Sequence, residues 1–305
     1  MEKIYKMIAD RIAKSLEAGV VPWRKPWKGG AAGAPRNLVT GKAYRGANVW
    51  TLILSGFSSP YWLTLRQANE LGGRIKKGST ATPVIFWKFF DEKESANGEA
   101  QTGAEPGKAG RGRRVMLRYY NVFNVDQCEG LTHPALVTPA NAPAFSPIEE
   151  AERITAKYAD CPRIQTGTDG AYYNPRLDYI SMPAAATFTK REEYYSTLFH
   201  EMAHSTGHER RLKRDGVADG AHRFGDPVYS KEELVAEFTA AFLCGVAGIE
   251  QATLENSAAY IAHWREHIAA NPQWVICAAG AAQKAADYIR GIKHDAKAPE
   301  THVSG

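Results

Sequence analysis

The segment His200-Glu201-Met202-Ala203-His204 has the residue types and the spacing that divalent-metal chemistry needs. Two histidines at positions i and i+4 of a helix project from one face, close enough to bind the same ion. A glutamate next to the first histidine can reach a water molecule on that ion and act as a general base. The pattern predicts a metal site with His200 and His204 as ligands and Glu201 as the catalytic residue.

A catalytic site of the metallopeptidase type needs a third protein ligand and an open position for water. His208 lies about 6 Å farther along the axis at about 1.5 Å per residue, and Gly207 is expected to end the helix first. The downstream segment YSKEELVAEFTAAFL predicts a second helix with Glu233 and Glu237 one turn apart. This is the gluzincin arrangement, which makes Glu233 the expected ligand and Glu237 a hydrogen-bond partner behind it. Glu232 stays open as the rival ligand.

Two helices must position these residues. Thr189 and Glu192 read as a capping box, and an apolar stripe follows, so the metal motif is predicted to lie in a helix over 190–206. That stripe consists of Tyr195, Leu198, Phe199 and Met202. In the second helix the residues expected to pack inward are Leu234, Phe238, Ala241 and Phe242. Upstream, residues 171–183 predict two short strands. They would form the edge of a sheet, to which a peptide substrate can add as a further strand.

Basic residues concentrate in the first part of the chain. Residues 1–130 carry 21 Lys and Arg against 11 Asp and Glu, a net charge of +10, and the remainder carries 17 against 22, a net charge of −5. The first part also holds five of the seven tryptophans. Basic, aromatic-rich composition is typical of nucleic-acid binders, although a solvated basic surface over core aromatics gives the same composition.

Aromatic and basic residues interleave in three segments, 20–28, 35–48 and 72–79. A single strand offers base faces to aromatic rings and phosphates to cations, whereas a duplex hides its base faces, so the interleaving favours single-stranded DNA. The candidate DNA-binding residues are Trp23, Arg24, Lys25, Trp27, Arg36, Asn37, Tyr44, Arg45, Lys76 and Lys77.

Length and composition predict a two-domain α+β protein. A chain of 305 residues with 44 % hydrophobic residues exceeds the usual size of one core. The proline-rich stretch 131–147 reads as a linker, which gives a DNA-binding domain over 1–130 and a metallopeptidase-like domain over 148–305. Within the first domain, apolar periodicity predicts a helix over 2–18, and residues 83–90 and 115–125 predict an antiparallel pair joined by a mobile insertion at 92–114.

The sequence also bears on compartment. The N-terminus lacks a secretory signal pattern, and no window approaches the roughly 18 apolar residues of a membrane span. The four cysteines stand far apart with no Cys-x-x-Cys spacing. We therefore expect a cytoplasmic protein with no membrane partner.

Nearly the whole chain resembles ArdC-type antirestriction proteins. In the first domain the resemblance rests on PWRKPW, PRNLVTGKAYRGAN, YWLTLRQANELGGRIKKGS and YNVFNVDQ, and in the second on LDYISMP, YYSTLFHEMAHSTGHERRLKR and EELVAEF. It implies a single-stranded-DNA-binding domain, a zincin-like metallopeptidase domain of gluzincin type, and protection of incoming plasmid DNA from host restriction.

Two functional hypotheses remain open at this point. In one, the protein is a peptidase that uses zinc, or manganese in its place, against an unknown protein substrate or restriction-system component. In the other, it coats single-stranded DNA or blocks a partner, and the metal site is structural or vestigial. Glu201 favours the first, because a structural site needs no general base.

Overall fold

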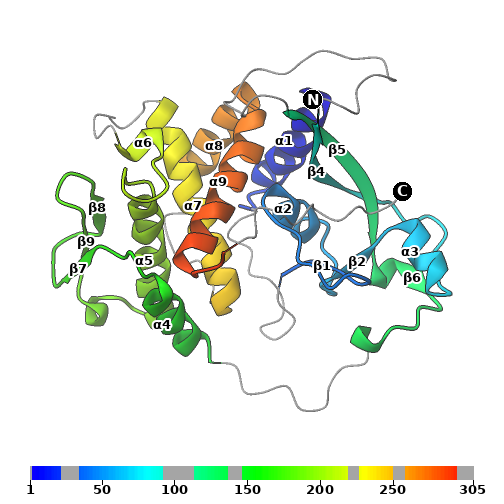
Figure 1. Ribbon diagram of the computed structural model, residues 1–305, viewed down its shortest axis with the longest axis horizontal. Coiled ribbons are helices and arrows are strands. Elements are labelled where there is room, and N and C mark those ends of the chain that lie inside the picture. The colour runs from blue at the N-terminus through cyan, green and yellow to red at the C-terminus, as the bar shows by residue number, and fades with distance from the viewer. Residues whose placement is uncertain are drawn as a thin grey trace.

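The computed structural model describes residues 2–21, 34–91, 113–136, 146–218, 227–249 and 258–293, apart from some side chains within these ranges. Figure 1 shows a sheet-containing N-terminal part on one side and a C-terminal part built mainly of helices on the other. The described residues omit 22–33 and 92–112, so most of the predicted interleaving segment 20–28 and of the predicted insertion 92–114 lies outside them.

The N-terminal part contains a four-stranded sheet of order β1-β2-β5-β4. Its strands are β1 (Arg36–Asn37), β2 (Tyr61–Leu63), β4 (Thr82–Asp91) and β5 (Arg113–Asn124). β1 pairs with β2 in parallel, and the other two pairs are antiparallel. The long β4–β5 ladder runs from Thr82↔Val122 to Asp91↔Arg113, which confirms the predicted antiparallel pair.

Further helices and strands complete this part of the molecule. They are α1 (Glu2–Glu17), α2 (Ala47–Ile53), α3 (Leu65–Glu70), β3 (Arg74–Ile75) and β6 (Cys128–Glu129), the last two forming a separate two-stranded sheet. Asn48 of α2 accepts a hydrogen bond from the N–H of Ile85 and donates one to its carbonyl, both at 2.7 Å. This side-chain amide therefore stands in for a neighbouring strand at the β4 edge.

The C-terminal part packs helices beside a small sheet. The helices are α4 (Pro147–Lys157), α5 (Arg191–Thr206), α6 (Asp215–Ala218), α7 (Pro227–Ala247), α8 (Ala258–Ala270) and α9 (Gln273–Ile289). The sheet has the order β7-β9-β8, from β7 (Arg163–Thr166), β8 (Tyr172–Asn174) and β9 (Tyr179–Met182). Its β8 and β9 are the two strands predicted over 171–183, whereas β7 was not predicted.

One continuous apolar core joins the two parts. α1 packs against α8 and α9 through a face that buries Ile8, Ile12 and Leu16. Trp50 of α2 is fully buried and stacks on Phe242 of α7, with ring centroids 4.8 Å apart and planes 10° from parallel. Figure 1 shows α1 and α2 next to the C-terminal helices. The helix that carries the candidate third ligand is therefore supported from the N-terminal part of the chain.

Polar contacts reinforce this junction. Arg45, just before α2, forms an ion pair with Asp287 of α9, whose side chain is 6 % exposed. The backbone N–H of Gly46 donates to Gln283 of α9 at 3.2 Å. Gly46 has a φ of 58°, in the left-handed region that glycine enters without strain. A side chain at this position would strain the turn that brings α2 to α9.

The helices predicted from periodicity are present with small shifts at their ends. α1 matches the prediction over 2–18, and α5 matches 190–206 apart from its first residue. The predicted capping box is wrong: α5 is capped by Lys190, which makes no side-chain capping hydrogen bond. None of the helices within the described ranges is long and apolar enough to cross a membrane.

Candidate metal centre

The two histidines of the motif lie on the buried side of α5. His200 is 9 % exposed and Glu201 is 8 % exposed. The Nε2 atoms of His200 and His204 lie 3.1 Å apart, and the two rings are nearly perpendicular, at 80°. Their nitrogen atoms therefore converge on one point, as the i and i+4 spacing on one helix predicts.

The carboxylate of Glu233 on α7 lies beside these nitrogens. Its Oε2 lies 3.5 Å from Nε2 of His200, and its Oε1 lies 3.4 Å from Nε2 of His204. Across the described residues, this is the one group of three or more His, Cys, Asp or Glu side chains whose ligand atoms approach within 4.8 Å of one another. α5 and α7 pack side by side, which brings residues 29 or more positions apart together.

The spacing of these groups suits a small divalent ion. In a tetrahedral zinc site with bonds of about 2.0–2.1 Å, two ligand atoms lie about 3.3–3.4 Å apart. The two Nε2 atoms lie 3.1 Å apart, and each lies 3.4–3.5 Å from a different oxygen of Glu233, with one ligand atom per residue within 4.8 Å of the others. Two imidazoles and one carboxylate also form a donor set that accepts zinc and manganese. The residues present therefore fit a divalent metal.

The charges around the histidines favour a cation. Burial alone would lower the pKa of His200, but the hydrogen bond to Glu233 and the charges of Glu201 and Glu237 raise it to about 9. For His204, burial likewise acts to lower the pKa, and the charge of Glu233 contributes most to its net rise. Carboxylates thus surround both imidazoles, and a divalent ion would neutralise the charge that now favours their protonated forms.

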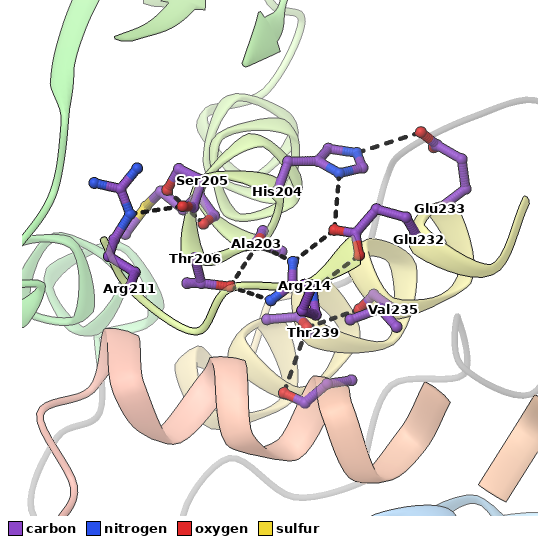
Figure 2. A network of polar contacts seen from close by, with 12 residues as sticks. Ala203, His204, Ser205, Thr206, Arg211, Arg214, Glu232, Glu233, Val235 and Thr239 are labelled. Carbon is purple, nitrogen blue, oxygen red and sulfur yellow. Dashed lines mark hydrogen bonds and ion pairs between the residues drawn. The ribbon is translucent and has the colours of Figure 1, made fainter. Parts of the chain in front are cut away.

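Glu232 lies on the other side of His204. Its Oε1 is 3.4 Å from Nδ1 of His204, and Arg214 donates to both of its oxygens, at 2.5 and 2.8 Å (Figure 2). Burial would raise the pKa of Glu232, but the hydrogen bonds from Arg214 and His204 lower it. The structure thus brings Glu233, rather than Glu232, to the Nε2 atoms.

Glu237 is buried, and its role as a hydrogen-bond partner behind the ligands stays a prediction. Its side chain is 1 % exposed, and its charge acts on the pKa of His200. Nδ1 of His200 is buried without a hydrogen-bond partner among the described residues. For His204, a carboxylate behind the ring is supplied by Glu232, whose Oε1 lies 3.4 Å from Nδ1. Arg214 was not predicted, because nothing in the sequence distinguishes it from the other basic residues over 210–214.

Comparisons with known proteins agree with this geometry. Residues 2–123 match the model for the N-terminal domain of anti-restriction factor ArdC, and residues 149–281 match that for a zincin-like metallopeptidase. A crystal structure of the antirestriction ArdC protein of plasmid R388, in its metal-free form, superposes with a TM-score of 0.71 and 36 % sequence identity. The alignment covers 94 % of this chain and 97 % of that one. The chain belongs to the ArdC family.

A second R388 ArdC structure and two further proteins are also similar to this chain. The Mn(II)-bound structure of R388 ArdC superposes with a TM-score of 0.73 at 35 % identity, with the same coverage. The protein y4eC of Sinorhizobium fredii is 33 % identical over 303 residues, covering 97 % of this chain and 94 % of y4eC. A DNA primase TraC of Escherichia coli is 35 % identical over 296 residues, but this chain spans only 27 % of its length. The ArdC-like fold, with its zincin-like C-terminal domain, confirms the predicted fold class.

In the ArdC-type N-terminal domain, two candidate DNA-binding residues are buried. Asn37 is 5 % exposed and donates to Gln67 at 3.0 Å, and Tyr44 is 8 % exposed with its ring 6.5 Å from that of Phe86. Buried side chains cannot stack on bases or reach phosphates. Their burial argues against direct DNA contact by Asn37 and Tyr44, for which DNA binding stays a prediction.

The other candidates are distributed over three settings. Arg36 is half-buried and donates to the carbonyl of Ala34, and Arg45 pairs with Asp287 at the junction. Lys76 and Lys77 are exposed, with Nζ of Lys76 2.8 Å from the carbonyl of Asp126. The remaining four lie outside the described residues, namely Trp23, Arg24, Lys25 and Trp27.

Proposed function

We propose that this ArdC-family protein binds single-stranded DNA and uses a metal-dependent peptidase site to protect incoming DNA from host restriction. The observation that carries the proposal is the convergence of His200, His204 and Glu233 with a glutamate, Glu201, next to the first histidine on the same helix. A purely structural site would need metal ligands and no general base.

The three ligand residues would hold one divalent ion. Zinc is the first candidate, and manganese is the second, because R388 ArdC has been crystallised with Mn(II). When bound, the ion would supply Lewis-acid activation of a water molecule and of a peptide carbonyl.

Glu201 has the role of general base in this proposal. It lies on α5 between the two ligand histidines and is 8 % exposed, so its carboxylate is largely shielded from solvent. Its function is to take a proton from the attacking water and to pass it to the leaving amine. The substrate would be a protein of the restriction system or another protein on the incoming DNA.

The DNA-binding part of the proposal rests on charge and on the family. Residues 1–130 carry the net positive charge, and their exposed cations include Lys76 and Lys77. The shared core suggests that DNA binding and metal binding belong to one folded body, so both are best measured on the full chain. In this proposal the protein acts in the cytoplasm.

The experiment compares Glu201→Gln with wild type in a restriction-protection assay in cells that carry a restriction system. The substitution keeps the size of the side chain and removes the base. We expect protection to fall to the level of a strain without the protein, while metal content and single-stranded-DNA binding stay at wild-type values. Glu209→Gln, at an exposed position after α5, is the matched control and should protect fully.

Full protection by Glu201→Gln would contradict the peptidase proposal. It would favour the alternative, in which the protein coats DNA or blocks a partner and the metal site is structural. In that case, variants that lose DNA binding should lose protection, whereas variants that lose metal should keep it.

A further inference from the structure

The guanidinium of Arg214 lies between the two helices that carry the candidate ligands. It follows α5 in the chain, and its side chain is 13 % exposed. Toward α5 it donates to the carbonyl of Ala203 at 2.8 Å and to the hydroxyl of Thr206 at 2.7 Å. Toward α7 it donates to both oxygens of Glu232. Figure 2 shows Arg214 at the centre of this network.

The network separates two neighbouring carboxylates. Glu232 and Glu233 each place an oxygen 3.4 Å from a ring nitrogen of His204, but on opposite sides of the ring: Glu232 faces Nδ1 and Glu233 faces Nε2 (Figure 2). A histidine that binds metal through Nε2 carries its proton on Nδ1 and donates it to an acceptor. Glu232 is placed to be that acceptor.

Glu232 would compete with Glu233 for the metal if no positively charged side chain were paired with it. Its side chain is 7 % exposed, and a buried carboxylate without a partner is costly. A nearby divalent ion would relieve that cost. The bidentate contact with Arg214 supplies the opposite charge in a fixed, planar geometry.

We propose that Arg214 is a positioning residue that assigns different roles to the two adjacent glutamates. It holds Glu232 as the hydrogen-bond acceptor for Nδ1 of His204, and so reserves the ligand position for Glu233. Because it also binds the Ala203 carbonyl, it fixes α5 and α7 in the relative position that the three ligands need. This inference rests on the proposed metal site.

The test measures zinc affinity by competition with a chromophoric chelator, using the full-length protein. Arg214→Met keeps much of the side-chain volume and removes the charge and the donors. We expect zinc affinity to fall by about 10–100-fold, the usual effect of losing support behind a ligand. Arg211→Met is the matched control: Arg211 is also buried and follows α5, but its ion pair is with Asp178, away from Glu232. Its zinc affinity should stay within about threefold of wild type.

A second variant separates assignment from general loosening. In Arg214→Met combined with Glu232→Gln, the competing charge is gone and the amide oxygen can still accept from Nδ1. We expect the double variant to bind zinc at least about fivefold more tightly than Arg214→Met. The Co(II)-loaded proteins give an independent readout: the visible absorption bands should change in Arg214→Met, as Glu232 enters the coordination sphere, and return toward wild type in the double variant.

The outcomes are decisive in either direction. Zinc affinity of Arg214→Met within threefold of wild type, or a loss that Glu232→Gln does not relieve, overturns the inference. If Arg214→Met does not fold, as judged by circular dichroism of the metal-free protein, Arg214→Lys replaces it and must lose at least threefold. Absence of zinc binding by wild type would instead refute the proposed metal site itself.

Discussion

Trp50 offers a direct test of the shared core, because its indole belongs to the N-terminal part and packs on the helix that carries Glu233. The side chain is fully buried, with Phe242 stacked at 4.8 Å and Phe238 tilted at 5.7 Å. We expect Trp50→Ala to destabilise the whole protein, including the helices around the candidate metal centre.

The size of this destabilisation follows from the apolar area that the Trp50 side chain buries. An indole buries about 200 Å², which at about 25 cal/mol per Å² gives an upper value of about 5 kcal/mol. Observed costs of Trp→Ala changes in cores are about 3–5 kcal/mol. We therefore expect the free energy of unfolding to fall by about 3–5 kcal/mol and Tm to fall by about 5–8 °C.

The assay is urea unfolding of the full chain, followed by far-UV circular dichroism for the helices and by fluorescence for the tryptophans. Both signals should move to a lower midpoint together in Trp50→Ala. Tyr119→Ala, at a position 53 % exposed, is the control and should stay within about 0.5 kcal/mol of wild type. A helical transition of Trp50→Ala at the wild-type midpoint would refute the shared core.

Two further predictions concern acid stability and DNA. Burial would raise the pKa of Asp178, but hydrogen bonds from Arg211 and Tyr173 lower it below its usual value of 3.8. The stabilisation that the Asp178 carboxylate gives the fold is therefore present above about pH 4 and is lost as pH falls through the lower folded-state pKa. Asp178→Asn should therefore be less stable than wild type at pH 7 by about 1–3 kcal/mol, and this difference in stability should narrow below pH 4 in acid titrations followed by circular dichroism. A difference that stays constant with pH would contradict the lowered pKa of Asp178. For DNA, the logarithm of the affinity for a single strand should fall linearly with the logarithm of salt concentration, by about 0.7 per phosphate contacted. Replacing both Lys76 and Lys77 by Ala should make that slope shallower, and tighter binding to duplex than to single strands would argue against base stacking.

The sequence predicted best those features that depend on local spacing. The His200 and His204 pair, the helix around it and the β4–β5 ladder all follow from periods of 3.6 or 2 residues. The choice between Glu232 and Glu233 did not, because it depends on how α7 crosses α5. A rotation of about 100° about α7 separates the two side chains, and tertiary packing alone fixes it.

Composition is ambiguous where the same residue type can serve in DNA binding or in core packing. Tyr44 stands among basic residues, as a base-stacking residue would, but its ring belongs to a core cluster. Similarly, the apolar face of α1 was evident from the sequence, whereas its partners α8 and α9 lie more than 240 residues farther along the chain. Arg214 could not be recognised because its partner Glu232 lies 18 residues away, in another helix.

The most direct test of the central claim is the metal content of the purified protein, measured by inductively coupled plasma mass spectrometry after loading with zinc and removal of excess ion. The geometry of His200, His204 and Glu233 predicts about one ion per chain in wild type, and loss of that ion in both His204→Ala and Glu233→Ala while single-stranded-DNA binding persists. Equal metal content in wild type and in both variants would show that these residues are not the ligands.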